Sequence, residues 1–214
     1  TAILEDIAVP MEALHETTIA LGEMLAKHKY EGSVIFGHAK DGNLHFLLNE
    51  NFDRPELLIR YQRFTEDMVS LILGKSGSLK AEHGTGRIMA PYLRRQCGDE
   101  LYEVMLQIKK LCDPDNILNP GVMINENRFI HIENLKISPT VDAEVDRCVE
   151  CGYCEPVCPS RNLTLTPRQR IVIRRALVDA ERSGDRDLVD ELSSRFDYDV
   201  VQTCAADSMC AVTC

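Results

Sequence analysis

The chain has 214 residues, with 24 Lys and Arg against 34 Asp and Glu, which gives a formal net charge of −10. This acidic balance argues against non-specific binding to nucleic acid, which requires a basic surface to displace counterions. No apolar run approaches the roughly 18 residues that a membrane-spanning helix needs, and a hydrophobic content of 44% is sufficient for a folded core.

The first part of the chain alternates between strand and helix patterns. The sequence predicts a strand over 3–9, a helix over 11–29, a hairpin with strands over 33–38 and 44–48, and a helix over 55–73 that ends at Gly74. The hairpin prediction rests on Asp41-Gly42, because Asp-Gly between two apolar runs is a strong turn signal. This mixed order of elements favours an α+β fold, an antiparallel sheet with packed helices, over a parallel doubly wound sheet.

The second part of the chain becomes helical and rich in cysteine. We expect a short strand over 77–81, a helix over 99–111, and a helix that begins at Thr166-Pro167 and ends near Gly184. Thr followed by Pro suits the N-cap and the first turn of a helix. Between the last two helices the pattern weakens, so the predicted domains are 1–125, a linker over 126–145, and a mostly helical, ferredoxin-like domain over 146–214.

Seven of the nine cysteines lie between residues 148 and 214, and four of them form the run Cys148, Cys151, Cys154 and Cys158. Their C-x2-C-x2-C-x3-C-P spacing is typical of bacterial ferredoxins, in which three close thiolates bind one 4Fe-4S cluster and the fourth serves a second cluster. Zinc, buried thiols and disulfides are the alternatives. The odd number of cysteines favours a reducing compartment over a secreted, disulfide-bonded scaffold.

The same spacing returns at the end of the chain with one change. Cys204, Asp207, Cys210 and Cys214 repeat the offsets of the first run, with Asp207 at the second ligand position. Exchange of the fourth ligands predicts one cluster bound by Cys148, Cys151, Cys154 and Cys214, and a second bound by Cys158, Cys204 and Cys210. Asp207 is either the fourth ligand of the second cluster, which would make that corner labile and allow a 3Fe-4S form, or a helix-capping residue. Two clusters imply transfer of one electron at a time.

The hairpin and a later segment carry a second group of ligand-type residues. The expected two-residue turn would place His38 opposite His45, where two imidazoles can share a divalent metal. Glu82 adds a carboxylate, and a site with two His and one Glu accepts Zn, Mn or Fe and leaves positions open for substrate. His83 would then be free to act as a general base. The alternative is that these histidines are ordinary core or surface residues.

Three segments, 37–45, 82–86 and 111–121, resemble the C-terminal domain of FAD-linked D-2-hydroxyacid dehydrogenases, the group that contains D-lactate, glycolate and D-2-hydroxyglutarate dehydrogenases. Their sequences are Gly-His-Ala-Lys-Asp-Gly-Asn-Leu-His, Glu-His-Gly-Thr-Gly and Leu-Cys-Asp-Pro-Asp-Asn-Ile-Leu-Asn-Pro-Gly. The cysteine-rich tail resembles the helical ferredoxin module that is fused behind this domain in long bacterial respiratory versions. Lys40 departs from the family pattern, which has Gly at this place in the turn.

The resemblance implies roles for individual residues. His38, His45 and Glu82 match the metal ligands that hold the hydroxyl and carboxylate of the substrate. His83 matches the base that takes the hydroxyl proton while hydride passes to FAD, and Asn119 matches a residue near the flavin. Electrons would leave FAD through the clusters to a quinone or cytochrome, in the cytoplasm or at the inner face of the cytoplasmic membrane.

The family carries an N-terminal FAD-binding domain, and no such domain precedes Thr1. We therefore expect this chain to be a piece of a longer polypeptide and to be inactive alone. D-lactate is the expected substrate of the whole enzyme, with D-2-hydroxyglutarate and glycolate as alternatives. A different interpretation is a non-catalytic electron-transfer or docking module, and only the dehydrogenase interpretation requires a divalent metal at His38, His45 and Glu82.

Overall fold

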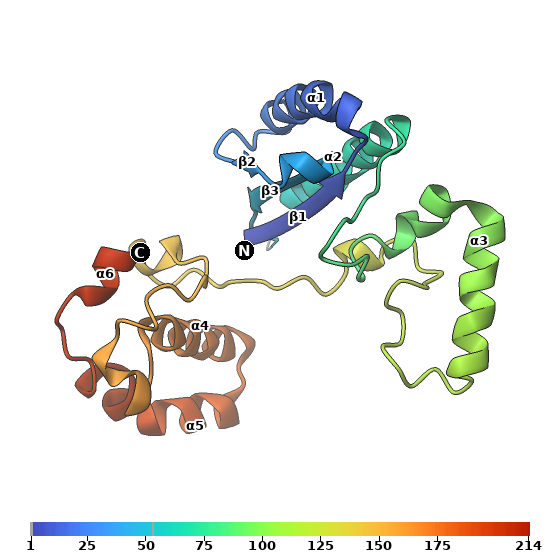
Figure 1. Ribbon diagram of the computed structural model, residues 1–214. Helices are drawn as coiled ribbons and strands as arrows, with labels where there is room; N and C mark the ends of the chain where they lie inside the picture. The colour runs from blue at the N-terminus through green and yellow to red at the C-terminus, as the bar shows by residue number, and fades with distance from the viewer. Residues whose placement is uncertain (1, 53) are drawn as a thin grey trace. The chain divides into compact units, whose positions relative to one another are not determined.

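The computed structural model describes residues 2–52 and 54–214 and divides into two compact units, unit 1 (Thr1–Ile137) and unit 2 (Ser138–Cys214) (Figure 1). Unit 1 combines a small antiparallel sheet with helices, and the described residues of unit 2 form helices and turns without a strand. The expected fold class is therefore confirmed. None of the described helices is both long enough and apolar enough to cross a membrane.

Unit 1 is built on three strands in the order β1-β3-β2. β1 (Ala2–Ala8) and β2 (Ile35–Phe36) both pair antiparallel with β3 (Asn43–Asn49), which is the central strand. Alternate residues of β3 belong to a core that residues of α1 (Leu14–Lys27) and α2 (Pro55–Gly74) complete; they are Leu44, Phe46 and Leu48. Because side chains alternate along a strand, Asn43 and His45 lie on the opposite face of the sheet, together with Leu47. The part of that face formed by Asp6, Asn43 and His45 is named the polar face.

The register of β1 places two neighbouring acidic residues on opposite faces. Asp6 pairs with His45 of the polar face, whereas Glu5 pairs with Phe46 of the core face. Both residues are buried, Asp6 with 0% and Glu5 with 1% of its surface exposed. Lys80 compensates the charge of Glu5, since its Nζ lies 2.7 Å from Oε2 of the carboxylate.

The predicted register of the hairpin is wrong by two residues. Phe36, and not His38, pairs with His45, because the connection contains a 3-10 turn (η2, Ala39–Asp41) where a two-residue turn was expected. Gly42 ends this turn in the left-handed region, at a φ of 65°. His38 therefore lies at the beginning of the turn and outside the sheet.

We expect Gly42→Ala to lower the free energy of unfolding of unit 1 by more than about 1 kcal/mol. A Cβ on Gly42 would lie 2.0 Å from the carbonyl oxygen of Val9, and the positive φ is unfavourable for alanine. Gly22→Ala is the matched control, because Gly22 lies inside α1 with open space around it. Alanine there should stabilise the helix by about 0.5–1 kcal/mol. Urea unfolding checks both, and a gain of stability in Gly42→Ala would contradict the prediction.

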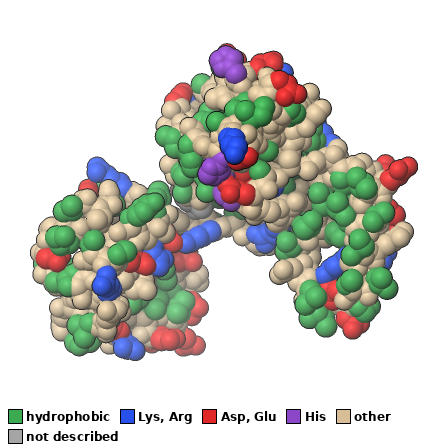
Figure 2. Space-filling view, viewed as in Figure 1, with side chains coloured by type: hydrophobic (Ala, Val, Ile, Leu, Met, Phe, Trp, Pro, Cys, Tyr) green, Lys and Arg blue, Asp and Glu red, His purple; other side chains and the backbone are tan. Residues whose placement is uncertain are grey.

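The third helix is longer than the predicted 99–111. α3 (Ala90–Cys112) extends back through a break at Gly98, where φ is 81°. Residues 90–97 were not predicted as helix because Gly98 interrupts the helical pattern, although Pro91 in the first turn is a usable signal. Beyond the break, apolar side chains are exposed and gather over α3 in Figure 2; they include Leu101, Val104, Ile108 and Leu111.

Unit 2 contains α4 (Pro167–Ser183), α5 (Arg186–Phe196), the π-helical η6 (Asp197–Gln202) and the short α6 (Met209–Thr213). α4 begins and ends where the sequence predicts. Thr166 and Gln169 form a reciprocal capping box at its start, and Gly184 ends it with a φ of 76°. Single 3-10 turns, η4 (Val145–Arg147) and η5 (Pro159–Asn162), flank the first cysteine run.

Candidate functional site

His45 lies at the centre of the polar face of unit 1. It stands on the central strand β3, and only 4% of the residue is exposed. Its Nε2 lies 2.8 Å from Oε1 of Glu82, and Nε2 of His38 lies 3.3 Å from the same oxygen. The two imidazole rings are perpendicular, with 89° between their planes. The structure thus brings His38, His45 and Glu82 together even though the hairpin register differs from the predicted one.

These three residues fit a divalent metal. One ligand atom from each lies within 4.8 Å of the other two, and imidazole nitrogens with a carboxylate are ligands that Zn²⁺, Mn²⁺ and Fe²⁺ accept. His38 and Glu82 are exposed while His45 is buried, so the group has an open side. A metal held here would have protein ligands on one side and room for a small ligand on the other.

His83 adjoins this group. Its ring stacks on that of His45, with 4.9 Å between the centroids and 19° between the planes, and its Nε2 lies 3.9 Å from Oε1 of Glu82. The side chain of His83 is 38% exposed. An imidazole that lies beside the ligand group and is reached by solvent can exchange a proton with a small molecule bound there.

A bend, and not a strand, carries Glu82 and His83. The strand expected over 77–81 is reduced to a single bridge between Ala8 and Ser78. The chain then passes Glu82 and turns through Gly84, which adopts a φ of 75°. The bend therefore runs beside β1, next to the face that carries His45.

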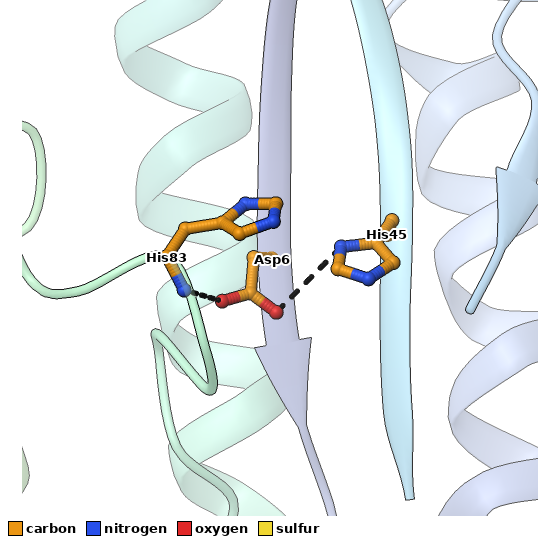
Figure 3. Close-up of side chains that lie close together, drawn as sticks. All are labelled: Asp6, His45 and His83. Atoms are coloured by element: carbon orange, nitrogen blue, oxygen red, sulfur yellow. Dashed lines mark hydrogen bonds and ion pairs between the residues drawn. The ribbon is translucent and has the colours of Figure 1, made fainter. Parts of the chain in front are cut away.

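Asp6 belongs to the same face and was not predicted as a site residue. Its Oδ2 accepts hydrogen bonds from the three successive backbone amides of residues 81–83 at 2.8–2.9 Å, and its Oδ1 lies 3.7 Å from Nδ1 of His45 (Figure 3). Burial alone would raise the pKa of Asp6, but these amides and the Asn43 side chain outweigh burial and hold the pKa below its usual value. The usable signal in the sequence is the pair of acidic residues, Glu5 and Asp6, inside an otherwise apolar strand.

Asn119 lies in the exposed loop after α3, at a left-handed φ of 44°. Asp113 shapes this loop by accepting hydrogen bonds from the amides of Ile117 and Leu118 at 2.9 Å. The Lys109 ammonium holds the pKa of the Asp113 carboxyl below its usual value. Among the described residues, no hydrogen bond or ion pair joins Asn119 to the histidines, so its place near a flavin stays a prediction.

The predicted ligands of the second cluster line one cavity of unit 2. Cys158, Cys204, Asp207 and Cys210 surround a space of about 260 Å³, and Arg170 forms part of its wall. Three thiols around one space fit the donor set of an iron–sulfur cluster. Asp207 also accepts a hydrogen bond from the amide of Met209 at 3.2 Å. Asp207 therefore both lines the cavity and contacts the first residue of α6. All nine cysteines are free thiols in the structure.

Helix α4 fixes both cysteine runs through buried arginines. Arg175, 5% exposed, donates to the carbonyl oxygen of Cys148 and to the carboxylate of Glu150, both at 3.0 Å. Arg170, 9% exposed, donates to Oγ1 of Thr203 at 3.1 Å, next to the first cysteine of the second run. Each guanidinium offers several donors in a rigid plane, so one helix can position the beginning of both runs.

Two protein families match the chain. Residues 1–123 match the family described as FAD linked oxidases, C-terminal domain, and residues 144–214 match the 4Fe-4S dicluster domain. The match to the second family covers all eight residues predicted as cluster ligands.

Relatives with curated names align mainly with unit 1. Glycolate oxidase subunit GlcD of Bacillus subtilis is 35% identical over 124 residues, and the mitochondrial D-lactate dehydrogenase [cytochrome] of Arabidopsis thaliana is 32% identical over 123 residues, each covering 58% of this chain. D-2-hydroxyglutarate dehydrogenase of Escherichia coli is 28% identical over an alignment of 181 residues that covers 75% of this chain. The chain spans only 26%, 22% and 18% of these relatives' own lengths, respectively.

Proposed function

Because the chain belongs to the FAD-linked oxidases, through their C-terminal domain, and carries a 4Fe-4S dicluster domain behind it, we propose that it is the substrate-binding and electron-transfer part of a 2-hydroxyacid dehydrogenase. We favour D-lactate as the substrate, with D-2-hydroxyglutarate and glycolate as alternatives; the relatives' names include all three acids. The convergence of His38, His45 and Glu82 on one point is the observation that supports the proposal most directly.

In this proposal the polar face of unit 1 binds and deprotonates the substrate. His38, His45 and Glu82 hold a divalent metal, which supplies a Lewis acid for the hydroxyl and carboxylate oxygens of a 2-hydroxy acid. His83 takes the hydroxyl proton on a ring nitrogen, since it lies beside the ligands and is open to solvent. Bound FAD supplies the acceptor for the hydride, and Asn119 contacts the flavin.

Unit 2 holds the electron-transfer centres. Cys148, Cys151, Cys154 and Cys214 bind one cluster, and Cys158, Cys204 and Cys210, with Asp207 at the fourth corner, bind the other. The shared cavity of Cys158, Cys204 and Cys210 supports the second set. The electron acceptor in this proposal is a quinone or a cytochrome. An electron-transfer module without catalytic function would need unit 2 but not the metal ligands of unit 1.

We therefore expect the chain to bind one Mn²⁺ ion per molecule at His38, His45 and Glu82. Mn²⁺ is the suitable probe because it prefers oxygen and imidazole ligands, whereas the cysteines of unit 2 compete for Zn²⁺. Electron paramagnetic resonance of free Mn²⁺ measures the binding. His38→Ala should weaken Mn²⁺ binding by more than about 100-fold, since loss of a residue that only hydrogen-bonds a metal ligand already lowers metal affinity by about 10–100-fold.

His15→Ala is the matched control, because His15 is an exposed histidine of α1 outside the ligand group. It should bind Mn²⁺ like the unaltered chain. Equal binding by His38→Ala and His15→Ala would contradict the proposed site and favour the electron-transfer module.

A further inference from the structure

We propose that Asp6 is a positioning residue that holds both His45 and the bend of residues 81–83, so that His38, His45 and Glu82 form one metal-binding group. This inference rests on the proposed function. It concerns a carboxylate that is fully buried on β1, directly opposite His45 in the register of the sheet.

The first contact of Asp6 fixes the backbone that carries Glu82. Oδ2 accepts hydrogen bonds from the amides of Ala81, Glu82 and His83 at 2.9, 2.8 and 2.9 Å. Three successive amides that converge on one oxygen form an anion-binding concavity, and the carboxylate supplies the anion from within the fold. Among the described residues, the strand pairing before the bend is limited to the single bridge between Ala8 and Ser78, so Asp6 is a main determinant of where the backbone of Glu82 lies.

The second contact of Asp6 concerns the orientation of His45. Oδ1 lies 3.7 Å from Nδ1 of His45, and this nitrogen is buried without a hydrogen-bond partner among residues 2–52 and 54–214. Nε2 of the same ring faces Glu82 at 2.8 Å. A histidine that ligates a metal through one nitrogen usually donates its other N–H to a carboxylate, which fixes the tautomer and the ring. The carboxylate of Asp6 lies on the Nδ1 side of His45, where it can accept this N–H.

Asp6 could instead be a metal ligand itself, because one atom each of Asp6, His45 and His83 lies within 4.8 Å of the others. Two observations argue against this. Oδ2 already accepts three amide hydrogen bonds, and Oδ1 accepts a fourth from Nδ2 of Asn43 at 2.6 Å. The rings of His45 and His83 are also nearly parallel (Figure 3), so their in-plane lone pairs cannot converge on one ion. The perpendicular rings of His38 and His45 can.

The test compares Asp6→Asn with Asp67→Asn in the whole chain. Asp67 is a matched control, because it pairs with a histidine, His28, at 2.8 Å but belongs to neither ligand group. Asp6→Asn should weaken Mn²⁺ binding by about 10–100-fold, and the amides of residues 81–83 should lose protection from hydrogen exchange while β1 and β3 keep theirs. Asp67→Asn should change neither quantity. Unchanged Mn²⁺ affinity in Asp6→Asn would overturn the inference.

The two readouts separate this inference from the proposed function. If the unaltered chain binds no Mn²⁺, the proposed metal site fails and the role of Asp6 in metal binding fails with it, whatever the amides do. If the chain binds Mn²⁺ and Asp6→Asn binds it equally well, only the role of Asp6 fails.

A measurement on the unaltered chain covers the case in which Asp6→Asn does not fold. Nitrogen NMR of the histidine side chains, in excess Zn²⁺ that also saturates the thiols, reports which nitrogen of His45 binds the metal. We expect Nε2 to be the ligand and Nδ1 to carry a proton. Coordination through Nδ1, or a deprotonated Nδ1, would overturn the inference.

Discussion

Lys80→Met is expected to destabilise unit 1 by about 3–5 kcal/mol. Nζ of Lys80 lies 2.7 Å from Oε2 of Glu5, and the two side chains are only 8% and 2% exposed. Methionine keeps most of the length of the lysine stem and removes the charge. The Glu5 carboxylate would then stay on the core face of β1 without its partner, and an unpaired buried charge is strongly unfavourable.

Lys75→Met tests whether burial is the cause. Lys75 pairs with Glu16 at a similar distance, 2.6 Å, but the side chains are 27% and 70% exposed. An exposed pair of this kind contributes about 0–1 kcal/mol. Urea unfolding gives the two free energies, and hydrogen exchange of the β3 amides reports unit 1 separately from unit 2. Equal losses in the two variants would contradict the prediction.

The deficit of Lys80→Met should also depend on pH. Burial raises the pKa of Glu5, and Lys80 opposes that increase. Without Lys80 the pKa of Glu5 rises further, so the folded variant keeps a proton that the unfolded chain has already released. The electrostatic deficit is therefore absent below the ordinary pKa of glutamate. It grows as the pH rises from the folded-state pKa of Glu5 in the unaltered chain to the higher one in Lys80→Met, and is constant above that. A deficit equal at about pH 5 and about pH 8 would indicate lost packing instead.

Helix boundaries were predictable where a local signal fixes them. Thr166 and Gly184 mark the ends of α4 in the sequence and in the structure, because capping acts between residues three or four apart. The register of the hairpin was not predictable in this way. Gly42 suits both a two-residue turn and the observed 3-10 turn, and its carbonyl accepts a hydrogen bond at 2.9 Å from Val9, which lies far away in the sequence.

In the candidate site, too, some residues could be predicted from the sequence, and others depend on contacts between distant parts of the chain. His38, His45 and Glu82 were predicted from imidazole and carboxylate groups in short segments that resemble a known family, whereas the hairpin pairing also used for His38 and His45 was wrong. Asp6 was not, since its contacts with Asn43 and His83 span 37 and 77 residues of the chain. Glu5 and Asp6 are neighbours with the same chemistry, and only the pairing of β1 with β3 decides that one faces the core and the other the site.

Cys158→Ser is expected to remove the cluster of the second cysteine run and to leave that of the first. Cys158 follows the first three cysteines in sequence, but it lines the same cavity as Cys204 and Cys210. After anaerobic reconstitution with iron and sulfide, the variant should therefore lose about four irons and the spectrum of one cluster. Iron and acid-labile sulfide give the amount lost, and electron paramagnetic resonance of the reduced protein shows which cluster it was.

The identity of the lost cluster follows from two reference variants. Cys204→Ser lacks a ligand of the second run, and Cys151→Ser lacks a ligand of the first run. If the fourth ligands are exchanged, the spectrum of Cys158→Ser matches that of Cys204→Ser; a match to Cys151→Ser would mean that each run binds its own cluster. Cys112→Ser should keep both clusters, because Cys112 is an exposed thiol outside both runs. The first run contains four cysteines and so has enough thiolates to bind a cluster by itself. Assignment of Cys158 to the other cluster therefore depends on its position in the fold, beside Cys204 and Cys210.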